Sequence, residues 1–220
     1  MTERIIDAFR GDTGSEVVAD FGAVGAMKAK VTAGEKVDVV ILTNTMIDEL
    51  ISAGLVEGGS RFDLGKVGTG VAVRTGTRVP DVSNADELKM SLRAASRIVC
   101  PDPAVATAGK IVMSLMEKLA VLDDVGSRLQ FFPNGYAAMN WLAQSEGQRE
   151  VGITQITEIL PNKGVAYAGP LPEQFQMKAV YSAALASKSL EPALARDFVG
   201  RFTAPSARSM LAEAGYELDR

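Results

Sequence analysis

The chain has 220 residues, of which 47% are hydrophobic and 23% are charged, and its net charge is −4. This is the composition of a folded globular protein, and the length suits one large domain or two small lobes. The acidic balance argues against a nucleic-acid partner, which requires a basic protein face. The net charge does not argue against a small anionic ligand, because backbone amides bind anions without any cation.

The sequence contains no histidine and a single cysteine, Cys100. These counts exclude an internal disulfide, a Ser-His-Asp triad and a histidine-ligated metal, so we expect no metal and no other cofactor. Cys100 ends an apolar stretch and is predicted to be a core residue. The sequence as given shows no apolar run of 18 residues and no secretory leader, so we expect no membrane insertion.

The first third of the chain alternates between predicted helices and strands. A helix is predicted at 2–10, where apolar residues fall on one face. Strands are predicted at 16–21 and 37–42, and helices follow them at 26–32 and 46–53. The continuous apolar run at 37–42 favours a parallel strand that is covered on both faces. This alternation is typical of an α/β fold.

The alternation continues to the end of the chain. Ser83 and Asp86 resemble a capping box at the start of a helix that ends at 95. Further strands are predicted at 67–74, 97–100, 129–132, 151–153, 165–168 and 176–187. Further helices are predicted at 108–119, 135–144, 155–160, 192–202 and 206–214.

Two turn-rich segments, 75–80 and 161–164, predict the boundaries of two lobes. Residues 1–76 and 161–220 would form a discontinuous lobe I, and residues 77–160 an inserted lobe II. Two crossovers would join the lobes, each a sheet with flanking helices. Ligands of such proteins bind in the crevice between lobes, at strand carboxyl ends and helix N-termini.

Two predicted loops link a strand to a helix through small residues. Residues 21–27 (FGAVGAM) could direct several backbone amides toward one anion, or could simply form a tight turn. Residues 102–109 (DPAVATAG) place Thr107 where its hydroxyl caps the helix or contacts a ligand, and Ala108 and Gly109 present free amides.

Two further loops carry polar side chains at the same kind of junction. Asn134 is a natural N-cap for the helix at 135–144. Thr154, Gln155 and Glu158 follow a predicted strand, where they could orient an anion or cap the next helix. Glu158 is the acidic residue nearest this predicted site, and therefore the first choice for proton transfer if the site is catalytic.

At these loops the sequence resembles the molybdate-binding proteins of ABC importers, which have the type II periplasmic binding protein fold. Residues 21–56 are similar to that family's second strand through its third helix, 102–109 to its Asp-Pro-x-x-x-x-Ala-Gly loop, and 151–160 to the strand that returns to the first lobe. The resemblance covers nearly the whole chain. It implies a two-lobed α/β fold, in which each lobe is a mostly parallel sheet flanked by helices.

The resemblance also implies a binding mode, in which amides and hydroxyls from both lobes hold an oxyanion without metal. Carried over by position, the expected ligand contacts are Ala23, Val24, Gly25, Thr107, Ala108, Gly135, Tyr136 and Gln155. The expected function is capture of a molybdate-like or tungstate-like oxyanion, or of a small carboxylate, for an ABC permease. The resemblance implies a periplasmic protein, and we expect a monomer.

The sequence departs from the family pattern at three places. The family begins with a strand and a serine-bearing loop, whereas this sequence starts inside the first helix; it would be cytoplasmic if Met1 is the true start. Ala-Val-Gly replaces the serine-rich first loop, and Gln155 replaces a tyrosine. A small carboxylate fits these changes, since Thr, Gln and Asn donors serve it equally well.

The departures keep an enzymatic alternative open. Some relatives of this family isomerise unsaturated carboxylates such as aconitate. That reaction needs a base to remove a proton next to a carboxylate, with amides stabilising the enolate-like charge. Glu158 and Tyr136 are the expected candidates for the base.

Overall fold

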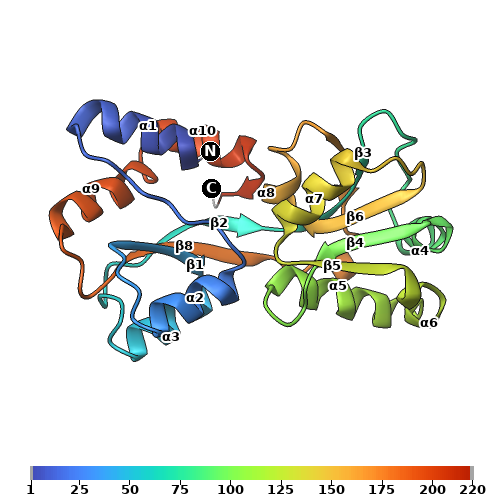
Figure 1. Ribbon diagram of the computed structural model, residues 1–220, viewed down its shortest axis with the longest axis horizontal. Coiled ribbons are helices and arrows are strands. Elements are labelled where there is room, and N and C mark those ends of the chain that lie inside the picture. The colour runs from blue at the N-terminus through green and yellow to red at the C-terminus, as the bar shows by residue number, and fades with distance from the viewer. Residues whose placement is uncertain (1, 219–220) are drawn as a thin grey trace. The chain divides into compact units, whose positions relative to one another are not determined.

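The computed structural model describes residues 2–218, and the chain divides into two compact units (Figure 1). The divisions fall between Lys66 and Val67 and between Lys178 and Ala179. Unit 1 contains the two outer segments and unit 2 the middle segment. The expected lobe boundaries, after residues 76 and 160, lie inside unit 2. The predicted two-part α/β class is confirmed.

Unit 1 is a four-stranded sheet in the order β1-β8-β2-β9, with helices on both faces. Its elements are α1 (Thr2–Thr13), α2 (Val24–Thr32), β1 (Val39–Thr43), α3 (Asn44–Ser52), β2 (Phe62–Val67), β8 (Ala179–Leu185), α9 (Pro192–Arg201), α10 (Pro205–Glu213) and β9 (Tyr216–Glu217). Helices α1, α9 and α10 lie on one side of the sheet and α2 and α3 on the other (Figure 1). Buried side chains of α1, α9 and α10 form one core with β2 and β8, and those of α2 and α3 form another with β1.

Two expectations for unit 1 are wrong. Residues 16–21 form no strand, and Val18 and Phe21 are 94% and 63% exposed. No described strand pairs with this segment, and strand-forming residues favour a strand only where neighbours pack against them. The apolar strand β1 pairs antiparallel with β8, with Val39 opposite Leu185, instead of lying in a parallel pair.

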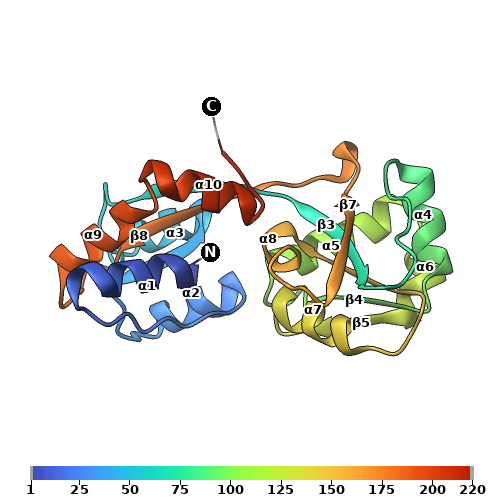
Figure 2. The same cartoon turned by 90° about the horizontal axis from the view of Figure 1, so that it is seen from above.

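Unit 2 is a five-stranded mixed sheet in the order β5-β4-β6-β3-β7. Its elements are β3 (Thr69–Arg74), α4 (Ala85–Ala94), β4 (Arg97–Pro101), α5 (Thr107–Lys118), α6 (Leu122–Val125), η1 (Gly126–Arg128), β5 (Leu129–Phe132), α7 (Gly135–Gln144), β6 (Glu150–Gln155), α8 (Ile156–Ile159), β7 (Val165–Pro170) and η2 (Glu173–Phe175). β4 lies parallel to β5 and β6, whereas β3 is antiparallel to β6 and to β7, which runs beside it in Figure 2. The sheet is therefore mixed and not mostly parallel.

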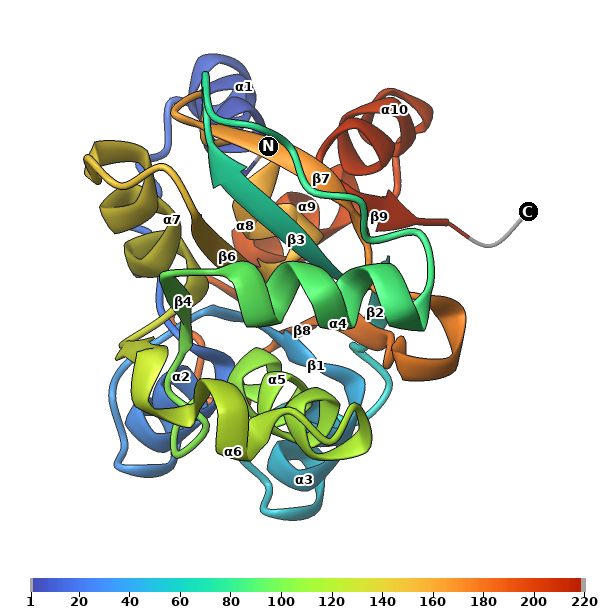
Figure 3. The same ribbon diagram turned by 90° about the vertical axis from the view of Figure 1, so that its right-hand side faces the viewer.

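This topology brings three strand-to-helix junctions to one edge of the unit 2 sheet. β4, β5 and β6 are parallel, so their carboxyl ends share an edge, and α5, α7 and α8 begin just after those ends. Helices α4 and α5 pack on one face of the sheet through Val71 and Ile153 (Figure 3). Helices α7 and α8 pack on the other face through Ala72 and Val99. We call this the carboxyl edge of unit 2.

The helix caps differ in detail from those expected. Asn84, and not Ser83, caps α4, because its side chain accepts hydrogen bonds from Asp86 N and Glu87 N, each at 3.0 Å. Asn134 caps α7 as predicted, accepting from Ala137 N at 2.8 Å. No helix within residues 2–218 has the length and apolar character to cross a membrane.

Candidate functional site

The loop between β4 and α5 is held in place by Asp102. Its side chain accepts a hydrogen bond from Ala104 N at 2.8 Å, and its carbonyl accepts from Val105 N and Ala106 N. Its own amide donates to Phe132 O at 2.7 Å, which ties this loop to the end of β5. Asp102 is therefore occupied in shaping the loop that leads into α5.

The N-terminus of α5 has no side-chain cap. Thr107 is the first residue of the helix and does not cap it, since the N-cap is Ala106. The first amide with a helical partner is that of Lys110, which donates to Ala106 O at 3.2 Å. The amides of Thr107, Ala108 and Gly109 precede that bond, so the helix itself offers them no acceptor. They carry the positive end of the α5 dipole at the carboxyl edge.

Gly109 allows α5 to start this close to β4. A Cβ atom at this position would lie 2.4 Å from Pro101 O and 2.6 Å from Pro103 N, both of them backbone atoms. Any side chain would push the first turn of α5 away from the strand end. The glycine of the Asp-Pro-x-x-x-x-Ala-Gly pattern thus lets the first turn of α5 pack closely against the end of β4. It thereby fixes the position of the Thr107 and Ala108 amides.

The first backbone amides of α7 donate hydrogen bonds to side chains of the protein itself. The Glu158 carboxylate accepts hydrogen bonds from Gly135 N at 3.1 Å and from Thr154 Oγ1 at 2.5 Å. The backbone amides of Tyr136 and Gln155 also donate to it. Burial raises the pKa of the Glu158 carboxyl above its usual range, although these donors act in the opposite direction. A carboxylate of the protein thus occupies the place of an anion at α7.

Gly135 is the residue that makes this contact with Glu158 sterically feasible. A Cβ atom at position 135 would lie 2.0 Å from Glu158 Oε2 and 2.1 Å from Thr154 Oγ1. The sequence indicated Asn134 and a glycine helix start, but it contained no signal that Glu158, 23 residues further along, would bond to Gly135.

A second set of polar side chains lies at the carboxyl edge, on the other face of the sheet. Gln155, the last residue of β6, is 5% exposed and lies opposite Thr69, the first residue of β3. Thr69 is 0% exposed. The sequence pattern at 67–74 indicates only a strand and does not single out Thr69, because the pairing of β3 with β6 is a long-range contact.

The contacts expected in unit 1 lie at the start of α2. Ala23 is its N-cap and offers no side-chain cap, and Met27 N makes the first helical bond, to Ala23 O at 3.0 Å. The amides of Val24 and Gly25 therefore precede the first helical bond, as those of Thr107 and Ala108 do in α5. The Ala23 and Val24 side chains are themselves buried, each 8% exposed.

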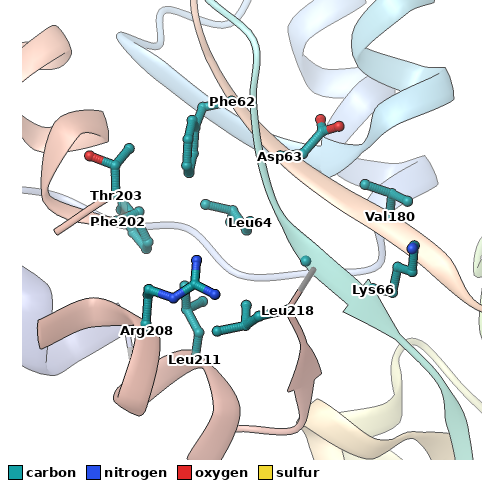
Figure 4. Close-up of a pocket in the computed structure, with 11 residues that line it drawn as sticks. Phe62, Asp63, Leu64, Lys66, Val180, Phe202, Thr203, Arg208, Leu211 and Leu218 are labelled. Atoms are coloured by element: carbon teal, nitrogen blue, oxygen red, sulfur yellow. The ribbon is translucent and has the colours of Figure 1, made fainter. Parts of the chain in front are cut away.

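Unit 1 also contains a pocket of about 180 Å³ between β2 and the C-terminal helices (Figure 4). Its lining is largely apolar, with Asp63, Lys66 and Arg208 as its charged members. None of the eight expected ligand contacts lines it. The expected contacts at the helix N-termini therefore lie outside this pocket.

The remaining reactive groups do not form a second site. Burial raises the pKa of the Cys100 thiol to about 12, with the charge of Asp102 adding to the effect, so this thiol stays protonated. Among residues 2–218, no cluster of three His, Cys, Asp or Glu side chains could hold a metal ion.

Solved structures with the same fold are binding proteins. The chain resembles the periplasmic molybdate-binding protein of Azotobacter vinelandii with a TM-score of 0.82 and 20% identity, over 99% of this chain and 94% of that one. It resembles the sulfate-binding protein SubI of Mycobacterium tuberculosis with a TM-score of 0.74 and 18% identity, over 97% and 81% of the two chains. These likenesses define a two-lobed periplasmic binding protein fold.

Comparison of the sequence with protein families assigns the chain to one family within this class. Residues 1–217 match the family described as bacterial extracellular solute-binding protein, and the chain belongs to it. A curated relative, an aconitate isomerase from Pseudomonas sp, is 28% identical over 191 residues, which are 86% of this chain and 71% of the relative.

The close contact at Gly135 predicts a cost for a single methyl group. Gly135→Ala should lower the free energy of unfolding by about 1–3 kcal/mol, because the new Cβ displaces the Glu158 carboxylate from its buried donors. Gly200→Ala is the matched control: a Cβ there meets nothing within 4 Å in helix α9, and it should stabilise by about 0.5–1 kcal/mol. Urea denaturation measures both, and equal effects in the two variants would contradict the contact.

The raised pKa of Glu158 predicts a specific pH dependence. Between the ordinary glutamate pKa of 4.5 and the raised folded value, the folded state binds the proton more tightly than the unfolded state. Protonation of Glu158 therefore makes its full contribution to the free energy of unfolding below pH 4.5. That contribution is lost as pH rises through the folded pKa. The melting temperature of wild type minus that of Glu158→Gln should therefore fall from pH 4 to pH 8. A difference that stays flat across this pH range would contradict this account.

Proposed function

We propose that this protein captures a small anion at the carboxyl edge of unit 2 and delivers it to an ABC importer. The observation that carries the proposal is the uncapped N-terminus of α5, whose first amides face no acceptor of their own helix. The solute-binding family supports capture and delivery as the role. Oxyanions and small carboxylates are the ligand classes that such amides suit.

The proposed contacts use neutral donors only. In unit 2 the amides of Thr107 and Ala108 and the side chain of Gln155 would hold the ligand. Such fixed dipoles bind an anion without the reorganisation that water requires. A ligand reaches the amides of Gly135 and Tyr136 only by displacing Glu158, because that carboxylate already accepts from them.

The contacts proposed in unit 1 are the amides of Ala23, Val24 and Gly25 at the start of α2. Like the start of α5, this helix start offers no side-chain cap. The starts of α2 and α5 present the same chemistry, a short row of backbone N–H groups at a positive dipole end. Serine hydroxyls are absent from this loop, which favours a ligand that backbone amides alone recognise.

The likenesses support two ligand classes within this proposal. The names of the structural neighbours, molybdate-binding and sulfate-binding, support a tetrahedral oxyanion. The aconitate isomerase supports a small carboxylate. The family is extracellular, and we propose that this protein works as a monomer in the periplasm with a permease as its partner.

A proline at the first position of α5 tests the proposal directly. Thr107→Pro removes the Thr107 amide, and the extended N-cap Ala106 (φ −123°, ψ 133°) accommodates the residue before proline. Thr107→Ala removes the hydroxyl but keeps the amide. Calorimetric titration with molybdate, tungstate, sulfate, phosphate, citrate and cis- and trans-aconitate should identify a wild-type ligand. Thr107→Pro should weaken its binding about tenfold.

The control is a proline at the same position of another helix. Ala85→Pro lies at the start of α4, after the extended N-cap Asn84, and should leave affinity unchanged. A wild-type protein that binds no member of the panel would refute the proposal. So would a Thr107→Pro variant that binds as tightly as Ala85→Pro.

Isomerisation of an unsaturated carboxylate is the second candidate function, favoured by the similarity to aconitate isomerase. Glu158 would act as base only after leaving its donors Gly135 N and Thr154 Oγ1, and Tyr136, 60% exposed, is the alternative base. Proton NMR in D2O should then show interconversion of trans- and cis-aconitate with deuterium incorporation. Glu158→Gln or Tyr136→Phe should abolish both changes, and an unchanged spectrum with wild type would eliminate this function.

A further inference from the structure

Thr69 has a buried hydroxyl without a hydrogen-bond partner. The residue is 0% exposed, and its Oγ1 atom has no partner within the described part of the chain. Other threonines of unit 2 differ: Thr77 Oγ1 donates to Arg74 O at 2.7 Å, and Thr154 Oγ1 donates to Glu158. Buried polar atoms are normally paired, so an unpaired hydroxyl at a predicted binding edge requires an explanation.

The backbone around this hydroxyl is held firmly. Thr69 N donates to Gln176 Oε1 at 2.8 Å, and Gln176 Nε2 donates back to Thr69 O at 2.9 Å. Leu171 N also donates to Thr69 O, at 3.0 Å. The side-chain amide of Gln176 thus acts as a short strand partner, and the hydroxyl cannot move far to find an acceptor.

The register of the sheet gives the direction of the Thr69 side chain. Thr69 lies opposite Gln155, and Val71 lies opposite Ile153, so all four side chains share one face. Val71 and Ile153 pack in the same core as Ile111 of α5. Thr69 and Gln155 are therefore on the α5 face, at the edge where α5 begins with uncapped amides.

We propose that Thr69 is a further ligand-contacting residue, whose hydroxyl donates a hydrogen bond to an oxygen of the bound anion beside Gln155 and the α5 amides. This inference rests on the proposed function and deepens it. A neutral hydroxyl, a carboxamide and backbone amides form a set of donors without a cation. Such a set selects an anion by the positions of its oxygens rather than by its net charge.

A valine of the same size tests this assignment with two readouts. Thr69→Val should weaken the binding of the wild-type probe, trans-aconitate or molybdate, about tenfold in calorimetric titration. It should also raise the melting temperature of the unliganded protein by about 2–4 °C, because it removes an unpaired buried oxygen. Thr69→Ser, which keeps the hydroxyl, should retain most of the affinity. Thr75→Val, at an exposed position, should leave affinity unchanged.

The outcomes separate this proposal from the proposed function. If wild type binds a probe and Thr69→Val binds it within twofold, the role of Thr69 is overturned and anion capture stands. A lower melting temperature for Thr69→Val would also overturn it, because the hydroxyl would then have a structural partner. If wild type binds neither of these probes nor any other anion of the panel, both proposals fail together.

Discussion

The amides at the start of a helix need acceptors, and this constraint organises the site. Helix α7 meets it internally, since Asn134 and the Glu158 carboxylate accept from its first residues. Helix α5 begins at the same sheet edge with no side-chain cap. The protein thus neutralises the α7 dipole with its own carboxylate, whereas the start of α5 has no such side chain, and an external anion at that place is what we propose.

Two glycines bring the helix starts close enough for this arrangement. Gly109 lets the first turn of α5 rest on the backbone that leaves β4, and Gly135 lets Glu158 and Thr154 close over α7. Neither needs an unusual backbone conformation, since neither has a positive φ. They are required because a Cβ atom would occupy space that other atoms fill. The same loops also carry the resemblance to molybdate-binding proteins, so the motif glycines have a packing reason.

The sequence predicted local features well and long-range features poorly. The helix at 135–144 and its cap Asn134 were predicted with the observed bounds, because both follow from neighbouring residues. The strand at 16–21 failed, because strand formation needs a partner that the local sequence does not specify. The site shows the same division. The loop residues Thr107, Ala108 and Gln155 are predicted by position alone, whereas the Glu158–Gly135 bond and the Thr69–Gln155 pairing depend on tertiary contacts.

Backbone amide NMR tests the central claim most directly, because it observes the proposed donors one at a time. On addition of the anion that binds most tightly, the account predicts the largest ¹H and ¹⁵N shifts at Thr107 and Ala108, saturating with the ligand concentration. The amide of Gly200, an exposed residue of helix α9, serves as an internal reference and should not move. Saturable binding that leaves the Thr107 and Ala108 amides unchanged would contradict the account.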